Sequence, residues 1–153
     1  MALDTESRTL PGFTFSAGQV SFGGMNIFFD VDDTLITWDV KLRPGVHDVF
    51  DALRGDGHEL YLWSGYGPRW EVVRRFDLHV HVLDCFWKPL YDHHARLGEL
   101  SVPFPPDYVV DDHEEIVTAF GGTLIQPAGQ PFVEDREMWR VYQEICGRLT
   151  VSH

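Results

Sequence analysis

NIFFDVDDTL, residues 26–35, places an apolar run directly before a cluster of carboxylates. An apolar run of this kind is typical of a strand buried in a parallel sheet. The pattern recurs in HELYLWS, residues 58–64, and in YVVDD, residues 108–112, which also end in polar side chains. Because the carboxyl ends of parallel strands share one edge of a sheet, the sequence predicts that these polar residues lie together.

Helical patterns separate the apolar runs and indicate the fold class. Val46, Val49, Phe50 and Leu53 recur at helical spacing, and glycines follow them. The remaining expected elements are a helix at 68–77, a strand at 80–83, helices at 89–100 and 114–120, a strand at 123–126 and a helix at 138–149. Strands that alternate with helices predict an α/β, Rossmann-like fold with a five-stranded parallel sheet between helices and right-handed crossovers.

Length and cysteine content indicate how many domains the chain forms and in which cellular compartment it is expected. The chain has 153 residues, which is typical of one domain. We expect a single core domain at residues 25–153, after an N-terminal extension at residues 1–24 with a short hairpin from Phe13 to Phe22. Two cysteines make neither a disulfide framework nor a Cys-rich zinc site. With no secretory signal and no run of about 18 apolar residues, we expect a cytoplasmic protein that does not span a membrane.

The charge balance is strongly acidic and narrows the classes of partner. Lys and Arg number 12 and Asp and Glu number 24, which gives a net charge of −12 with neutral histidines. A field of this sign repels polyanions, so nucleic acid is not expected as a partner.

The polar residues that follow the strands suggest phosphate chemistry with a metal ion. Crowded carboxylates must bind protons or a cation, and an all-oxygen cluster suits Mg²⁺. One Asp can act as a nucleophile, and a second can protonate the leaving group and then activate water. A hydroxyl can donate to a phosphate oxygen, and an ammonium stabilises the charge of the transferring group. The residues concerned are Asp30, Asp32, Asp33, Thr34, Ser64, Lys88, Asp111 and Asp112.

The order D-x-D-x-T, then Ser, then Lys, then D-D resembles the haloacid dehalogenase superfamily of phosphohydrolases. The motifs stand here as FFDVDDTL (28–35), LYLWSG (60–65), Lys88 in FWKP, and YVVDD (108–112). The matched stretch runs from residue 26 to about residue 126, which is most of the chain. The resemblance implies a Mg²⁺-dependent phosphatase that acts on phosphoric monoesters.

The resemblance also implies a role for each motif residue. Asp30 would be the nucleophile and a metal ligand, and Asp32 the general acid/base with its backbone carbonyl on the metal. Asp112 would take the other metal-ligand position, with Asp111 behind it to orient Lys88 or a water. Which of these two is the direct ligand stays open. The residues expected to bind phosphate, or to brace the loop that does, are Thr34, Ser64, Gly65 and Lys88.

The spacing between the motifs is similar to that of capless members of the superfamily. The gaps from Leu35 to Ser64 and from Ser64 to Lys88 span 29 and 24 residues, too few for a cap domain. RPGV, residues 43–46, and the Asp-Asp pair are similar to magnesium-dependent phosphatases. Capless relatives commonly act on macromolecular phosphoesters or borrow a lid from a neighbouring subunit. The substrate is thus expected to be a small phosphoester or a phosphoprotein, and a homodimer would supply such a lid.

Three alternatives accompany this interpretation. The aspartates could be ordinary turn and helix-capping residues. The domain could be a non-catalytic member of the same fold that binds phosphate, metal or a protein. Carbon–halogen cleavage also uses an Asp nucleophile, but it needs neither Asp32 nor a metal. Four further residues fall near the expected mouth of the site but fit packing or solvent exposure equally well, so no role is assigned to Trp38, Arg43, Tyr66 and Arg69.

Overall fold

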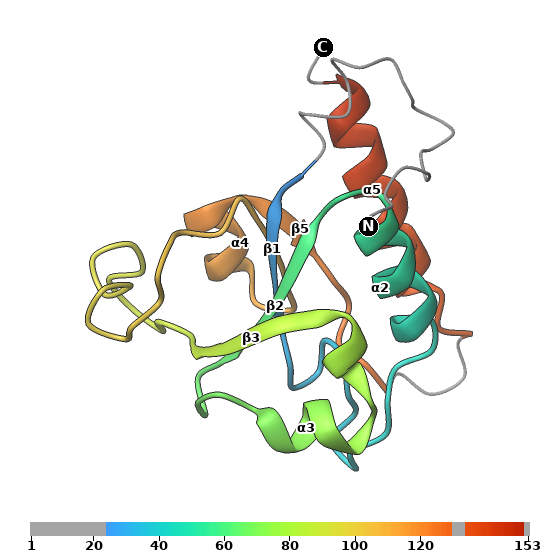
Figure 1. The fold of residues 1–153 in the computed structure, drawn as a ribbon, viewed down its shortest axis with the longest axis horizontal. Helices are drawn as coiled ribbons and strands as arrows, with labels where there is room; N and C mark the ends of the chain where they lie inside the picture. Colours follow the sequence, from blue (N-terminus) through green and yellow to red (C-terminus); the bar gives the residue numbers. More distant parts are fainter. Residues whose placement is uncertain (1–23, 130–133, 152–153) are drawn as a thin grey trace, which may run out of the picture.

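The protein contains a five-stranded sheet in which every neighbouring pair of strands is parallel (Figure 1). The computed structural model describes residues 24–129 and 134–151, so the hairpin expected at residues 13–22 lies outside the described residues. The strand order is β3-β2-β1-β4-β5. The strands are β1 (Asn26–Asp30), β2 (Glu59–Ser64), β3 (Val82–Trp87), β4 (Tyr108–Asp111) and β5 (Gly122–Leu124). The predicted α/β class with a five-stranded parallel sheet is confirmed.

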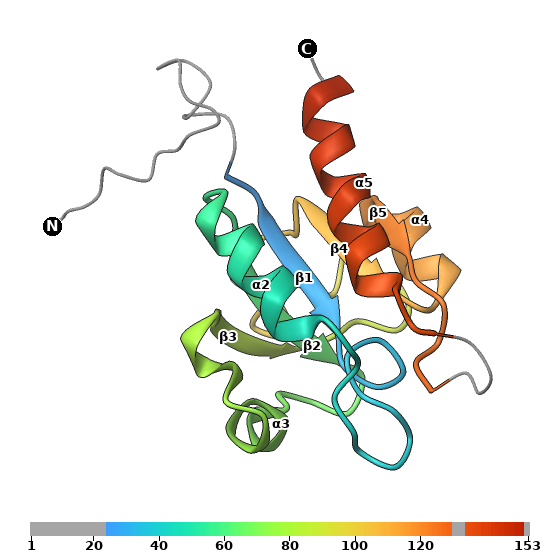
Figure 2. The same cartoon turned by 90° about the vertical axis from the view of Figure 1, so that its right-hand side faces the viewer.

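Among the residues that the structure describes, four α-helices flank the sheet. They are α2 (Val46–Gly55), α3 (Trp70–Arg75), α4 (Glu114–Phe120) and α5 (Glu137–Val151), and a short 3₁₀ turn, η1 (Leu78–Val80), follows α3. Figure 2 shows α2 and α5 side by side, and the two helices are in contact. Within the described part of the chain, no helix is both long enough and apolar enough to cross a bilayer.

Two apolar layers cover the two faces of the sheet. On β1, Ile27 and Phe29 point into a large core that α2, α3 and α5 complete. Phe28 points the other way, into a second core with Trp63 and with Ile116 of α4. All five of these side chains are fully or almost fully buried. Successive side chains of β1 point to opposite faces of the sheet, and both faces are covered, which explains why residues 27–29 are all apolar.

The strand register brings the carboxyl ends of β1, β2, β3 and β4 to one edge. Asp30 pairs in register with Trp63, and Phe29 pairs with Val110. Asp30 therefore stands level with the end of β4 on one side. On the other side it stands level with Trp63 of β2, and Ser64 is the next residue of that strand. Ser64 pairs in turn with Trp87, so Lys88 emerges at the same edge.

The chain between β1 and α2 forms a short flap, residues 36–42, closed by an antiparallel bridge between Ile36 and Leu42. The rest of the connection from β1 to β2 is a tight loop and α2, and the connection from β2 to β3 holds α3 and η1. Neither connection contains a separate domain, in agreement with the expected absence of a cap.

Two sequence-based predictions of secondary structure are wrong. The third strand covers Val82–Trp87 instead of 80–83, because η1 occupies residues 78–80. The helix expected at 89–100 is replaced by turns. Asp92 has a left-handed backbone angle there, with a φ of 46°, which no continuous α-helix allows. The segment is instead held by burial of Leu97 against the second core.

Candidate functional site

The loop after β1 folds back so that its side chains meet the end of the strand. The carbonyl of Val31 accepts hydrogen bonds from the N–H groups of Thr34 and Leu35 at 3.2 and 2.9 Å. Asp33 has a φ of 65°, a left-handed conformation that Gly adopts without strain and that Asp tolerates. The turn brings the Thr34 hydroxyl back to Asp30, where Oγ1 donates to Oδ2 at 3.2 Å.

A buried lysine joins two strand ends. The Nζ of Lys88 donates to Oδ1 of Asp30 and to Oδ2 of Asp111, both at 2.9 Å. The backbone N–H of Lys88 donates to the carbonyl of Ser64 at 2.9 Å, which ties the end of β3 to the end of β2. The Lys88 side chain is only 4% exposed, so this ammonium is isolated from solvent and depends on the two carboxylates for its solvation.

Burial perturbs the protonation of this group of side chains. Burial raises the pKa of Asp30 to about 7, although the charge of Lys88 opposes the shift. The pKa of Asp111 is also raised, by burial and then by the charge of Asp30. Burial lowers the pKa of Lys88, but the two carboxylates outweigh it and hold the pKa above its ordinary value. Three carboxyl groups, those of Asp30, Asp111 and Asp112, crowd around one ammonium here, and a bound cation would favour their ionised forms.

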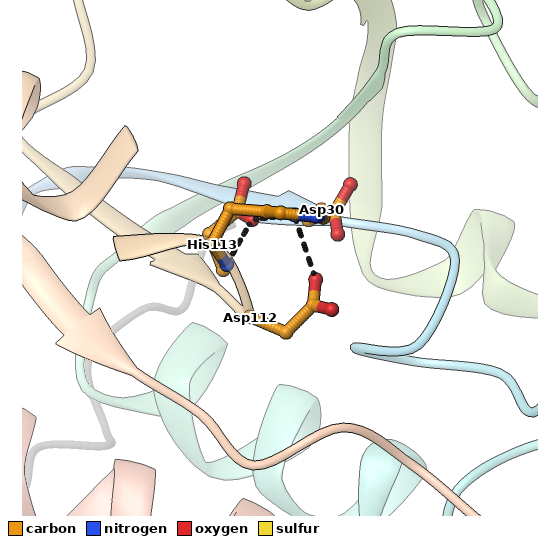
Figure 3. A group of neighbouring side chains, drawn as sticks. Asp30, Asp112 and His113 are labelled. Carbon is orange, nitrogen blue, oxygen red and sulfur yellow. Dashed lines mark hydrogen bonds and ion pairs between the residues drawn. The ribbon is translucent and has the colours of Figure 1, made fainter. Parts of the chain in front are cut away.

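Asp112 and His113 complete the group from the start of the chain after β4 (Figure 3). Thr34 Oγ1 lies 3.4 Å from Oδ1 of Asp112, and Nδ1 of His113 lies 3.3 Å from the same oxygen. Ligand atoms of Asp30, Asp111, Asp112 and His113 all lie within 4.8 Å of one another. His113 was missed in the sequence, and only its position directly after the Asp-Asp pair could have signalled it.

The donor atoms fit a hard divalent cation such as Mg²⁺. Both oxygens of Asp111 are engaged, Oδ2 by Lys88 and Oδ1 by the backbone N–H of His113 at 2.9 Å. Asp112 makes no hydrogen bond or ion pair with Lys88 in the described part of the chain, and its side chain instead meets Thr34, His113 and Asp30. Asp30, Asp111 and Asp112 can each offer an oxygen to a metal ion within this group, and Asp30 and Asp111 also hold Lys88.

Ser64 and Gly65 lie at the same edge of the sheet. Ser64 is 1% exposed, and its Oγ accepts a hydrogen bond from the N–H of Tyr66 at 3.0 Å. Accepting this bond leaves the hydroxyl hydrogen available to donate. A Cβ on Gly65 would lie 3.0 Å from the side chain of Leu90, so only glycine fits there without displacing a neighbour.

The carboxylate of Asp32 is not part of the buried group. It forms an ion pair with Nη1 of Arg69, and its side chain is 39% exposed. Nε of Arg69 also donates to Glu71 at 2.6 Å. The expected acid/base residue therefore faces outward in this structure, next to an arginine to which the sequence assigned no role.

Arg43 is a second arginine whose role sequence reasoning missed. It is 2% exposed, and Nη1 donates to the backbone carbonyl of Thr34 at 3.1 Å. Nε donates to Oδ2 of Asp135 at 2.8 Å, from the chain just before α5. Arg43 thus clamps the loop that carries Thr34. Its position directly before Pro44 and Gly45 gives no indication of this burial.

No protein-family model matches the sequence, and a search of curated proteins finds no matching sequence. The four motifs and the geometry of their residues are therefore the observations that bear on function.

Proposed function

We propose that the chain is a capless, Mg²⁺-dependent phosphohydrolase of the haloacid dehalogenase type, which cleaves phosphoric monoesters through an aspartyl-phosphate. The observation that carries the proposal is the set of contacts around Asp30. Its two carboxylate oxygens are held separately, by Lys88 and by Thr34, and Thr34 also reaches Asp112. Side chains from three distant segments of the sequence thus converge on the carboxylate that the motifs single out as the nucleophile.

Asp30 and Asp112 would hold the metal ion, together with the backbone carbonyl of Asp32. When bound, Mg²⁺ would neutralise the excess carboxylate charge and stabilise negative charge on the phosphoryl oxygens. The ion would also favour the ionised form of Asp30, which burial alone disfavours. Ionised Asp30 is the form required of a nucleophile.

In the first half of the reaction, a carboxylate oxygen of Asp30 attacks phosphorus and the bond from phosphorus to the ester oxygen breaks. Protonated Asp32 gives its proton to the departing oxygen, so the alcohol leaves neutral. Lys88 and the hydroxyl of Ser64 stabilise the negative charge on the other phosphoryl oxygens. For this step Asp32 must exchange its ion pair with Arg69 for contact with the leaving group.

In the second half, Asp32 accepts a proton from water as that water attacks phosphorus of the aspartyl-phosphate. The bond from phosphorus to the Asp30 oxygen breaks, which restores the carboxylate and releases inorganic phosphate. Asp32 ends the cycle protonated, as it began. The backbone N–H of Gly65 lies next to Ser64 and could hold a phosphate oxygen during both steps.

The substrate class is a phosphoester, either a small molecule or a phosphoprotein. The net charge of −12 disfavours nucleic acid. The absence of a cap between the strands leaves the site open, so a second copy of the chain would be a natural cover in a homodimer. The chain has only two cysteines and so no disulfide framework, which favours action in a reducing compartment such as the cytoplasm.

Hydrolysis of p-nitrophenyl phosphate tests the proposal. The assay compares the native chain, Asp30→Asn and Asp33→Asn, each with and without Mg²⁺. Asp33→Asn is a matched control, because it makes the same chemical change three residues away and Asn tolerates the left-handed conformation of that position. We expect Mg²⁺-dependent turnover in the native chain and in Asp33→Asn, and its loss in Asp30→Asn. An Asp30→Asn protein as active as the native chain would refute the mechanism.

The alternative is a non-catalytic domain that binds phosphate, metal or a protein partner. The ion pair of Asp32 with Arg69 favours it, because this pair turns the expected acid/base away from the buried carboxylates. A folded native chain that binds Mg²⁺ but hydrolyses no member of a broad phosphoester panel would support this alternative over the enzyme.

A further inference from the structure

His113 brings a nitrogen donor to a group of side chains that otherwise offers only oxygen. Its ring Nδ1 lies 3.3 Å from Oδ1 of Asp111 and 3.3 Å from Oδ1 of Asp112. Ligand atoms of these three residues and of Asp30 lie within 4.8 Å of one another, and Figure 3 shows His113 beside Asp30 and Asp112. The candidate metal site therefore holds one imidazole among three carboxyl groups.

The turn after β4 positions this ring. The backbone N–H of His113 donates to Oδ1 of Asp111 at 2.9 Å, which closes a turn of the kind that Asp favours. Asp111 has no exposed side-chain surface, whereas the His113 side chain is 59% exposed. The imidazole thus stands at the rim of the buried carboxylates, where an ion that enters from solvent can reach it.

The distances from Nδ1 fit ligands on one tetrahedral ion. Bonds of about 2.0–2.1 Å from Zn²⁺ to nitrogen and oxygen place neighbouring tetrahedral ligands about 3.3–3.4 Å apart. Octahedral Mg²⁺, with bonds of about the same length, brings neighbouring ligands to about 2.9 Å. Both carboxylate oxygens stand 3.3 Å from Nδ1 of His113, which matches the tetrahedral value. A protonated ring paired with the carboxylates would have similar distances, so metal binding is the property that distinguishes the two states.

An imidazole also selects a class of metal ion. Mg²⁺ prefers carboxylate, carbonyl and water oxygens, whereas imidazole suits Zn²⁺ and other first-row transition ions. The group contains no thiolate, so a soft ion has no preferred ligand in it. One nitrogen with several carboxylate oxygens is a donor set for a borderline ion such as Zn²⁺.

We propose that His113 is a ligand of the metal site and that it makes this site prefer Zn²⁺ to Mg²⁺. The inference rests on the metal site of the proposed function but not on the phosphatase reaction. Asp112 and His113 would hold the ion together with one of the two buried carboxylates, Asp30 or Asp111. Zn²⁺ would then compete with Mg²⁺ for the same carboxylate oxygens.

Isothermal titration calorimetry on the full chain tests the proposal without any need for turnover. Zn²⁺ and Mg²⁺ are titrated separately at one fixed pH, because protons compete with metal ions for imidazole. The variant is His113→Asn, which places an amide oxygen near the position of Nδ1 and so exchanges a nitrogen donor for an oxygen donor. The control is His79→Asn, the same change at an exposed histidine outside the group.

We expect the native chain to bind Zn²⁺ about tenfold more tightly than Mg²⁺, or better. His113→Asn should lower this ratio of affinities about tenfold and should change the Mg²⁺ affinity less than about threefold. Retained Mg²⁺ binding also shows that the variant is folded. His79→Asn should keep the native ratio.

Three outcomes would overturn the proposal: equal affinities of the native chain for the two ions, an unchanged ratio in His113→Asn, or equal losses of both affinities in that variant. Failure of the proposed function is recognised separately, by hydrolysis. A chain whose Zn²⁺ preference depends on His113 but which hydrolyses no phosphoester would retain this ligand and lose the phosphatase. A Mg²⁺-dependent phosphatase with an unchanged ratio in His113→Asn would do the reverse.

Discussion

The Nζ of Lys88 lies 2.9 Å from Oδ2 of Asp111, a carboxylate whose side chain has no exposed surface. The same ammonium also binds Asp30, so one positive charge is shared between the ends of two strands. Removing one partner of such a buried group leaves the other charges without compensation, which is far more destabilising than losing a surface pair.

Lys88→Met should therefore destabilise the protein strongly. At about pH 8, where the carboxylates favour ionisation, we expect the free energy of unfolding to fall by about 3–5 kcal/mol. Urea denaturation measures the change. Lys41→Met provides the control, because Lys41 is 77% exposed in its pair with Asp39 and should contribute less than about 1 kcal/mol. Equal stabilities of the two variants would contradict the burial argument.

Arg43→Lys should weaken the loop that carries Thr34. Lysine cannot reproduce the two directional bonds that Arg43 makes to Asp135 and to the Thr34 carbonyl. We expect a loss of about 2 kcal/mol in the free energy of unfolding, measured by urea denaturation. Arg136→Lys, at an exposed pair with Glu134, should change it by less than about 0.5 kcal/mol. Native stability in Arg43→Lys would show that the clamp is dispensable.

Neighbouring glycines before and in β5 should respond very differently to a methyl group. A Cβ on Gly122 would lie 1.9 Å from the carbonyl oxygen of Val109, so alanine must push β5 away from β4. A Cβ on Gly121 meets nothing within 4 Å, and only its φ of 88° opposes alanine. Thermal and urea unfolding should show a loss above about 4 kcal/mol for Gly122→Ala and about 1–2 kcal/mol for Gly121→Ala. The reverse order would contradict the register of β4 and β5.

His58 should make the protein less stable in mild acid. Burial lowers the pKa of this histidine from its ordinary value of 6.5. Its Nδ1 accepts the backbone N–H of Met25 at 3.1 Å, which requires the neutral ring. Because the folded pKa lies below the unfolded one, the stabilising contribution is present above about pH 6.5 and is lost as the pH falls through the folded value.

Replacement of this histidine isolates its contribution. His58→Asn keeps an acceptor near Nδ1 but cannot be protonated, so its stability should fall less than that of the native chain between about pH 7.5 and about pH 5. Urea denaturation at the two pH values gives the comparison. His79→Asn, at an exposed position, should follow the native pH profile. Parallel profiles for the native chain and His58→Asn would exclude His58 as the source.

Mg²⁺ should stabilise the folded chain through Asp112. A ligand at about 100 times its Kd raises the free energy of unfolding by about 2.7 kcal/mol when it binds only the folded state. We expect Mg²⁺ to raise the melting temperature of the native chain and of Asp92→Asn, a control at an exposed aspartate, but not that of Asp112→Asn. Differential scanning fluorimetry with added Mg²⁺ or a chelator makes the measurement. Equal stabilisation of Asp112→Asn would remove this residue from the proposed metal site.

The central strands and the helix α4 could be predicted from the sequence, because their signals are local. Apolar runs mark β1, β2 and β4, and the predicted helix at 114–120 has the bounds of α4. The bounds of the edge strand β3 were predicted wrongly because several of its side chains are exposed, so its residues do not form a continuous apolar run. Asp84 and the half-exposed Trp87 interrupt its pattern. The false helix at 89–100 has a helical composition, but burial of Leu97 and a bond from His94 to the carbonyl of Ala119 favour a different path.

In the candidate site too, some contacts could be predicted from local sequence signals and others could not. The parallel sheet places the ends of β1, β3 and β4 at one edge, so Asp30, Lys88 and Asp111 are expected there together. The length of the Lys88 side chain then lets its ammonium reach past the end of β2 to Asp30 and Asp111. The partners of Arg43 and Arg69 cannot be predicted in this way, because they depend on the paths of two long side chains. Arg43 meets a residue 92 positions away, and Arg69 meets one 37 positions away. No local periodicity encodes such contacts.

The central place of β1 has a consequence for the order of folding. β1 pairs with β2 on one side and with β4 on the other, and these partners lie far apart along the chain. Pairing between distant segments closes long loops and slows folding. Pairing of β1 with β2 and of β2 with β3 places Lys88 beside Asp30, but Asp111 and Asp112 join them only when β4 pairs with β1. The complete group of charges therefore depends on the more distant of the two pairings that β1 makes.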